Sequence, residues 1–241
     1  MTSSRPRRFA TTRWSIVNAA AHPSTATARI AMEDLCQTYW PPVYAFVRRQ
    51  GIPRTDAEDA TQAFFLHLLN SDFVQTADRD RGRFRSFLLK SVSNYLKADY
   101  RKQTATKRGG AVEIFSLDFD AGEKQYNAEA SESVTPEQLF ERRWALTLLQ
   151  NTVNQLRSEY ADRNHLKLFD ALEAHVNQNA ARLPYAELCD TLGMTEDAIK
   201  QAARRLKLRY REILRTEIAN TVDSKDDIDD ELRQLMNALS G

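Results

Sequence analysis

Apolar residues recur along this chain at the three- and four-residue spacing of amphipathic helices, and no stretch alternates long enough to indicate a useful strand. The segments with this pattern lie at about 30–50, 55–70, 84–102, 137–160, 164–179, 184–192 and 195–220. A polar, arginine-rich loop is expected at 71–83. The pattern therefore predicts an all-α fold.

These helices fall into two domains joined by a flexible linker, because residues 111–135 lack helical periodicity and are rich in Ser, Glu and Asp. Thr135-Pro136-Glu137 marks a helix start, with Thr135 as the cap and Pro136 at the first helical position. The predicted segments are a weakly ordered N-terminus (1–28), a first domain (29–110), the linker (111–135), a second domain containing a helix-turn-helix (136–222) and an acidic amphipathic tail (223–241).

Local signals refine the first domain. Pro41-Pro42 interrupts the first helix, so we expect a kink or a break there. Gly51-Ile52-Pro53 is a stop signal. Thr55 or Asp56 is expected to cap the next helix, which has acids in its first turn.

Composition is typical of a folded, non-membrane protein: 42% of residues are hydrophobic and 28% are charged, with only seven Gly and seven Pro among 241 residues. No apolar run approaches the roughly 20 residues that a membrane helix needs. Cys36 and Cys189 are isolated, which favours a reduced, cytoplasmic setting. The four His residues are scattered, so we expect neither a metal site nor a cofactor.

The small net charge of +1 hides an uneven distribution. Residues 1–110 hold 18 Lys and Arg against 9 Asp and Glu, whereas residues 111–160 hold 4 against 9. Such a basic first half is compatible with nucleic-acid binding, although an uneven solvated surface explains it as well.

The helix at 55–70 carries its acids on one face. Asp59 and Gln62 are three residues apart, and Glu58 and Gln62 are four apart, while the core side is apolar. A capped, solvated helix is one interpretation of this face. A catalytic carboxylate pair is another, which is weak because no His or Cys pattern accompanies the acids.

The helix at 84–102 has a polar, mostly basic face opposite its apolar one. Its members are Lys90, Asn94, Lys97 and Arg101. The segment before it adds further cations, namely Arg79, Arg81, Arg83 and Arg85. A solvated basic face is common, but such a cluster can also neutralise the phosphates of a DNA strand.

Residues 184–214 have a helix-turn-helix pattern. Gly193 suits the tight turn, and Thr195 suits the cap of the second helix. That helix has a basic face, which a major-groove recognition helix requires. The candidate DNA-contacting residues are Lys200, Gln201, Arg204, Arg205, Lys207 and Arg211.

Taken in order, the run Asp56-Ala57-Glu58-Asp59-Ala60-Thr61-Gln62, the Phe84-to-Asn94 segment and the helix-turn-helix resemble an extracytoplasmic function (ECF) sigma factor of RNA polymerase. The resemblance implies a non-enzymatic protein that binds core RNA polymerase and promoter DNA and promotes melting. By this resemblance Asp56, Glu58, Asp59 and Gln62 dock on the polymerase clamp. The loop 71–83 and Asn94 receive a −10 base, and the helix-turn-helix reads the −35 element. An anti-sigma or other regulatory protein is a further candidate partner.

Two other functions compete with this interpretation. A helix-turn-helix regulator acting without polymerase explains 184–215 but not the acidic helix and arginine-rich loop. A carboxylate-dependent nuclease needs clustered metal ligands, which the first domain's pattern does not supply.

The tail, residues 223–241, has an apolar stripe beneath its acids, formed by Ile228, Leu232, Leu235, Met236 and Leu239. A helix this short is marginal alone, because isolated helices below about 12–15 residues rarely persist in water. It is expected either to dock, on the basic surface near Arg204 and Arg211 or on a partner or polymerase, or to be a frayed acidic end.

Overall fold

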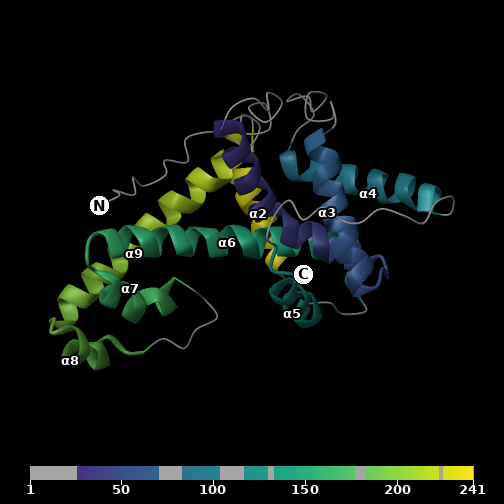
Figure 1. Ribbon diagram of the computed structural model, residues 1–241. Coiled ribbons are helices and arrows are strands. Elements are labelled where there is room, and N and C mark those ends of the chain that lie inside the picture. The colour runs from purple at the N-terminus through teal and green to yellow at the C-terminus, as the bar shows by residue number, and fades with distance from the viewer. Residues whose placement is uncertain are drawn as a thin grey trace. The chain divides into compact units, whose positions relative to one another are not determined.

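A computed structural model of the protein describes residues 26–70, 83–103, 117–129, 133–176, 183–222 and 225–240 (Figure 1). The α-helices are α2 (Ala26–Arg49), α3 (Arg54–Asn70), α4 (Phe84–Gln103), α5 (Phe119–Glu129), α6 (Pro136–Asp162), α7 (Leu166–Leu172), α8 (Leu188–Leu192), α9 (Glu196–Ala219) and α10 (Ile228–Ser240). Short 3-10 turns occur at Glu173–His175, Tyr185–Glu187 and Lys225–Asp227. The described residues contain no strand, which confirms the all-α prediction.

Contacts divide the chain into two compact units, Met1–Ala145 with Ala219–Gly241, and Leu146–Ile218. This division differs from the predicted boundary at 136, because the first turns of α6 pack with the first unit. Residues 219–241 return to that first unit as well. No helix in the described ranges is both long and apolar enough to cross a membrane.

Aromatic side chains form the core of the first unit. Tyr39 of α2 meets Phe84 of α4 edge-on, with ring centroids 5.1 Å apart, and Phe46 meets Phe140 of α6 at 6.5 Å. All four rings are almost wholly buried. Such edge-to-face pairs add to the stabilisation from burial, and here they join α2 to α4 and to the first part of α6.

Two local predictions for the first unit need correction. Of the kink or break expected at Pro41-Pro42, the break does not occur, because α2 runs from Ala26 to Arg49 with both prolines inside. The helix α3 begins at Arg54, and the N–H of Ala57 donates to the Pro53 carbonyl at 2.9 Å, so Thr55 and Asp56 lie in the first turn instead of capping it. The stop at Gly51 holds, with Gly51 in the left-handed region at φ 84°.

The prediction that 111–135 is a flexible linker is wrong for residues 119–129, which form α5. This helix packs on α2, where Phe119 lies 5.4 Å from Trp40 between ring centroids. Residues 111–116 and 130–132 lie outside the described ranges. The predicted cap of α6 is confirmed, because the N–H of Gln138 donates to Thr135 Oγ1 at 3.2 Å and the N–H of Thr135 donates to the Gln138 side chain at 2.9 Å.

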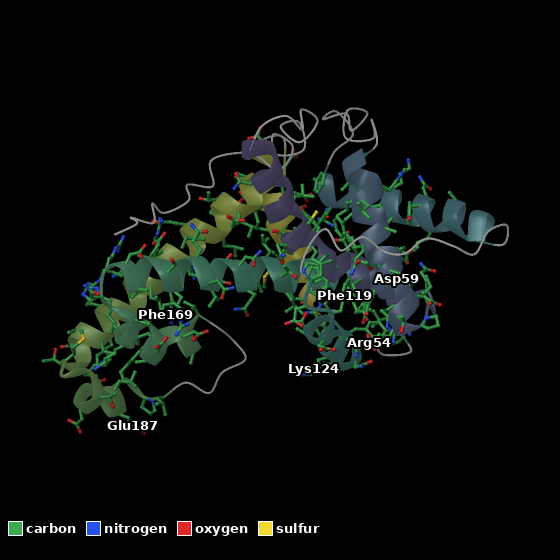
Figure 2. The ribbon with its side chains drawn as sticks, in the orientation of Figure 1. Arg54, Asp59, Phe119, Lys124, Phe169 and Glu187 are labelled. Carbon is green, nitrogen blue, oxygen red and sulfur yellow. The ribbon has the colours of Figure 1, made fainter. Side chains whose placement is uncertain are left out.

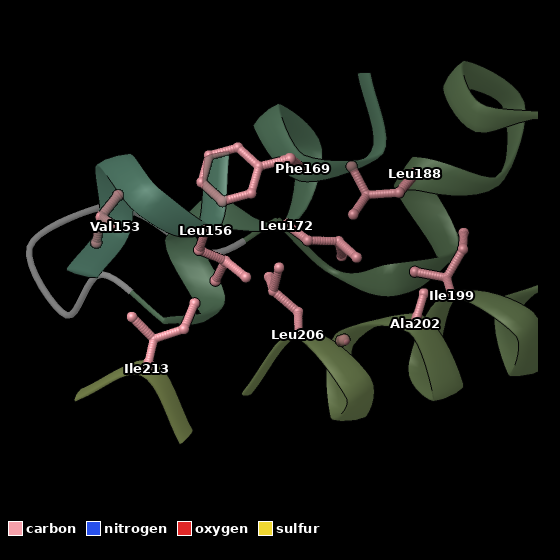
Figure 3. Close-up of a cluster of buried hydrophobic side chains, with 10 residues drawn as sticks. Val153, Leu156, Phe169, Leu172, Leu188, Ile199, Ala202, Leu206 and Ile213 are labelled. Carbon is pink, nitrogen blue, oxygen red and sulfur yellow. The ribbon is translucent and has the colours of Figure 1, made fainter. Parts of the chain in front are cut away.

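One apolar cluster holds the second unit together (Figure 3). Leu156 of α6, Phe169 and Leu172 of α7, and Leu206 of α9 are fully buried in it. Leu188 of α8 and Ile199 of α9 extend the cluster to the turn between those two helices. The cluster therefore fixes the position of α9 within the unit.

Candidate functional site

The acidic face of α3 lies opposite its buried row. Ala57, Phe64, Phe65 and Leu68 are buried on the apolar side, while Asp56 and Asp59 are exposed and Gln62 is half-buried. Thr61 is also buried, and its hydroxyl donates to the Ala57 carbonyl at 2.7 Å. All four residues predicted to dock on polymerase therefore lie on α3, and one of them, Glu58, forms an ion pair.

Glu58 is paired with Arg54, one turn earlier, at 2.7 Å between Nε and Oε1. The same guanidinium bonds Asp120 of α5, and Figure 2 shows Arg54 beside that helix. Hydrogen bonds to these two carboxylates raise the pKa of Arg54. Arg54 therefore neutralises part of the predicted acidic face, and Asp56 and Asp59 carry its exposed negative charge.

An ion-pair cluster anchors α5 beside this face. Arg48 of α2 donates to Glu123 from Nε at 2.9 Å and from Nη2 at 2.8 Å, and the Tyr44 hydroxyl donates to the same carboxylate at 2.6 Å. The Arg48 bonds, opposed by burial and assisted by Tyr44, lower the pKa of Glu123 to about 2. Arg48 also lies over the Tyr126 ring, 4.8 Å from its centroid. Glu123 is thus ionised wherever the protein is folded near neutral pH.

The exposed side of α4 carries three of the residues predicted to meet DNA. Lys90, Asn94 and Lys97 are exposed, while Phe84, Leu88 and Val92 on the other side are buried. Arg79 and Arg81 lie outside the described residues, and the side chain of Arg101 does too. The described part of α4 therefore presents one continuous polar face with two cations and an amide.

Arg85 is not exposed as expected of a phosphate contact; its side chain is only 4% accessible. It donates to Glu231 of α10 at 2.8 and 3.0 Å, bonds Glu141 of α6, and lies over the Trp144 ring at 4.6 Å. Burial lowers the pKa of Arg85, but its bonds to Glu231 and the nearby carboxylates outweigh this, and the net shift is upward. In this conformation its guanidinium is enclosed, which argues against the predicted DNA contact.

Residues 185–219 form a short helix, a tight turn and a long helix. Gly193 ends α8 in the left-handed conformation, at φ 62° and ψ 32°, and the Met194 N–H donates back to the Cys189 carbonyl at 3.2 Å. Thr195 then caps α9, because its hydroxyl accepts from the Ala198 N–H at 3.3 Å. Both positions behave as predicted. Cys189, half-buried, packs at the edge of the apolar cluster.

Cations gather on the exposed side of α9. Lys200, Arg204, Lys207 and Arg211, spaced four, three and four residues apart, line one surface hollow. Tyr185 and Leu208 complete its lining, and Leu208 is 48% exposed. Gln201 and Arg205 are exposed beside it. Sequence spacing anticipated the cations but not the apolar part, since Leu208 and Tyr185 lie outside the basic row.

Arg209 shows that charge alone does not mark this surface. It is exposed on α9, but its guanidinium forms a two-bond pair with Glu159 of α6, at 2.7 and 2.8 Å, and a third bond with Glu212 at 2.9 Å. These bonds, chiefly to Glu159, raise the pKa of Arg209. Arg204 and Arg211 face the hollow, whereas Arg209 is held against α6 within the second unit.

No group of three or more His, Cys, Asp or Glu residues is placed to hold a metal ion within the described part of the chain. The carboxylates of α3 are accompanied by an arginine and a glutamine instead. The acidic face of α3 and the basic row of α9 are charged surfaces of the kind that bind oppositely charged partners.

Comparison with known families finds a match for the part of the chain that contains α3 and α4. The family model of sigma-70 region 2 matches residues 35–106. This match supports a sigma-70 family RNA polymerase sigma factor, with core RNA polymerase and promoter DNA as partners and a part in promoter melting. No curated protein and no solved structure was found to match the chain.

The region 2 match covers both the acidic face of α3 and the polar face of α4. It ends before α5, so the helix that anchors to Arg48 and Arg54 is an addition to the matched segment. Sequence reasoning missed α5, although Phe119 and Tyr126 supplied an apolar signal one seven-residue repeat apart. It also missed the burial of Arg85, because nothing near Arg85 in sequence points to its partner in α10.

Proposed function

We propose that this protein is an ECF-type sigma factor that docks on core RNA polymerase, recognises −35 and −10 promoter elements and promotes DNA melting. One observation carries the proposal: a region 2 domain and a helix pair with a basic exposed face occur in the same chain. A regulator acting without polymerase would need only the second of these. The proposed protein has no catalytic chemistry of its own, needs no cofactor and works in the cytoplasm.

Polymerase docking is assigned to the exposed part of the α3 face. Asp56 and Asp59 supply the charge, and Gln62 supplies a hydrogen-bonding amide one turn on. Charged residues at the edge of an interface mainly steer association and fix its register. Glu58 already bonds Arg54, so its contribution is indirect, through the position of Arg54.

Promoter melting is assigned to α4 and the residues before it. A base that leaves the stack loses a few kcal/mol, which contacts to the flipped base must offset. Asn94 can pair with a base edge because its amide both donates and accepts hydrogen bonds. Lys90 and Lys97, one turn to either side, are placed to hold the flanking phosphates. Arg79 and Arg81, which precede α4 in sequence, and Arg101, four residues after Lys97, are assigned to the same DNA contact.

The −35 element is assigned to α9. Arg204 lies at the centre of the row that lines the hollow, between Lys200 and Lys207. Arginine can contact guanine through two hydrogen bonds, whereas lysine acts more as a point charge on phosphate. Leu208 and Tyr185 give the hollow an apolar part that fits a thymine methyl group. An anti-sigma or other regulatory protein is a further candidate partner.

The docking assignment is tested with purified core RNA polymerase. The double variant Asp59→Lys with Gln62→Ala should bind the polymerase at least about tenfold more weakly, a loss of about 1.4 kcal/mol. The control is Asp162→Lys, which reverses an exposed charge at the end of α6. Circular dichroism checks that each variant remains folded.

Two outcomes would contradict the proposal. Equal polymerase affinity for the folded double variant and the wild type would remove the docking assignment. Promoter DNA binding without any polymerase binding by the wild type would favour the regulator. Promoters for these assays come from transcript mapping after overexpression, and permanganate footprints report whether they melt.

A further inference from the structure

The tail helix α10 is anchored by a carboxylate that is completely buried. Glu231 is 0% exposed, and it accepts hydrogen bonds from Arg85 at 2.8 and 3.0 Å. Arg83, directly before α4, pairs with the same carboxylate at 2.6 Å and also with Asp230. Ile228 and Leu235, on the same side of α10, are buried too. The tail is therefore a docked part of the first unit, instead of a frayed end or a strap on Arg204 and Arg211.

The two arginines differ in what holds them. Arg85 bonds Glu231 and Gln234 of the tail. It also bonds Glu141 and lies over the Trp144 ring, so it keeps partners outside α10. Arg83 keeps 26% of its side chain exposed, and within the described residues it pairs with two tail carboxylates, Asp230 and Glu231. Arg83 is thus the arginine whose surroundings would change most if the tail moved.

Carboxylates and phosphates compete for arginine because a guanidinium binds either one through the same fork of N–H donors. Arg83 leads directly into α4, whose exposed side carries Lys90, Asn94 and Lys97. A DNA strand that follows this face and bonds Arg83 would need the place that Asp230 and Glu231 occupy.

We propose that α10 is an autoinhibitory contact, in which Asp230 and Glu231 hold Arg83 in place of a DNA phosphate, so that tail docking and strand binding at Arg83 exclude each other. The proposal rests on the proposed function, since it takes α4 and Arg83 to be part of a DNA-binding surface. The tail is an intramolecular competitor, and its release would be coupled to strand capture.

The contacts are of a kind that can be released. The side chain of Asp230 is 42% exposed, so its pair with Arg83 is screened by water and salt. The helix has only 13 residues, a length that is marginal without its docking surface. Burial of the Glu231 ion pairs carries a desolvation cost that offsets much of their attraction. Displacement by DNA must still offset the loss of the buried pair between Glu231 and Arg85.

The test measures binding of a short, fluorescein-labelled, single-stranded DNA oligonucleotide to the full chain by anisotropy. Asp230→Asn with Glu231→Gln removes the two carboxylate charges and keeps the shapes. The matched control, Asp227→Asn with Asp229→Asn, removes two charges from the same region without touching the Arg83 pairs. The first variant should bind about 5- to 150-fold more tightly than wild type, the range of ordinary coupling between sites. The gain should shrink as salt rises.

Three results would overturn the proposal: equal affinity of the first variant and the wild type, an equal gain in the control variant, or no binding by any of them. A gain that persists in an Arg83→Ala background would overturn it too, because the competition is assigned to Arg83. If the double variant unfolds, Asp230→Asn alone replaces it and must show a smaller gain of the same sign. The assay contains no polymerase, so failure of polymerase docking would be seen separately.

Discussion

Single charged side chains decide much of the structure of the first unit. Burial raises the pKa of Glu141, against the lowering effect of Arg85, whereas Glu123 has its pKa lowered by Arg48. At Glu123, three hydrogen bonds from Arg48 and Tyr44 outweigh the effect of burial on the pKa, whereas at Glu141 the effect of burial is the larger one. The pKa values of these two carboxylates in the first unit are therefore shifted in opposite directions.

The low pKa of Glu123 predicts a pH-dependent stability. Because the folded value is below the unfolded one, its contribution is complete above the unfolded pKa and is lost as pH falls toward about 2. Glu123→Gln should lower the free energy of unfolding by about 1–3 kcal/mol at pH 7, as expected for bonds to a charged group. Urea unfolding at several pH values measures this.

The control for this prediction is Glu137→Gln, which changes an exposed acid in the first turn of α6. Its stability should stay within about 1 kcal/mol of the wild type at every pH, the upper size of the interaction between an exposed acid and a helix N-terminus. If the loss from Glu123→Gln were as large at pH 2 as at pH 7, the ionised carboxylate would not be the source of the stabilisation.

At the scale of helices, the sequence predicted best where the apolar spacing was long and regular. The helices α3, α4 and α9 all lie close to their predicted positions, since each buries one regular stripe. The helix α5 escaped notice because it is short, and its contact with α2 rests on the small size of Gly122. Pro41 and Pro42 indicated an interruption of the first helix, but α2 continues through both of them. Tyr39, Val43 and Phe46 are buried on either side of the prolines, so tertiary packing supports the helix there.

Gly122 makes the docking of α5 on α2 possible. A Cβ added there would lie 2.8 and 2.9 Å from two ring atoms of Trp40, which is itself packed against Tyr44 and Phe119. Gly122→Ala would gain about 1 kcal/mol in helix propensity, but overpacking a buried contact costs about 1–3 kcal/mol. We therefore expect net destabilisation in thermal unfolding. The control, Asn127→Ala on the exposed side of α5, should gain stability slightly; a gain in both would contradict the steric argument.

The two sides of α9 predict different effects of two arginine substitutions. Arg204→Ala, in the hollow, should weaken binding to the −35 element by about 1–3 kcal/mol and relax its sequence preference. Arg209→Ala removes an exposed pair with Glu159 and Glu212 and should change stability by at most about 1 kcal/mol. Fluorescence titrations of promoter fragments compare them. Equal losses for both variants would show that net charge, not the hollow, determines binding.

At the scale of the whole molecule, the boundary between units could not be read from the sequence. The helix α6 has one cap, at Thr135, and no break at 145, where the contacts change from one unit to the other. The return of 219–241 to the first unit depends on Glu231 meeting Arg83 and Arg85, which are nearly 150 residues away in sequence. The apolar stripe left open whether the tail docks or frays, and only the fold shows that it docks and which residues it meets.

Because the tail belongs to the first unit, we expect its loss to destabilise that unit and not the second. Deleting residues 223–241 removes the burial of Ile228 and Leu235 and leaves Arg85 without Glu231. Breaking a buried pair by removing one partner costs about 3–5 kcal/mol, so the first unit should be strongly destabilised. Amide hydrogen exchange should show lost protection in α4 and in the first turns of α6, with α7, α8 and the apolar cluster around Leu206 unchanged. Lost protection in α7 and α8 instead would mean that the tail supports the second unit and that its assignment to the first is wrong.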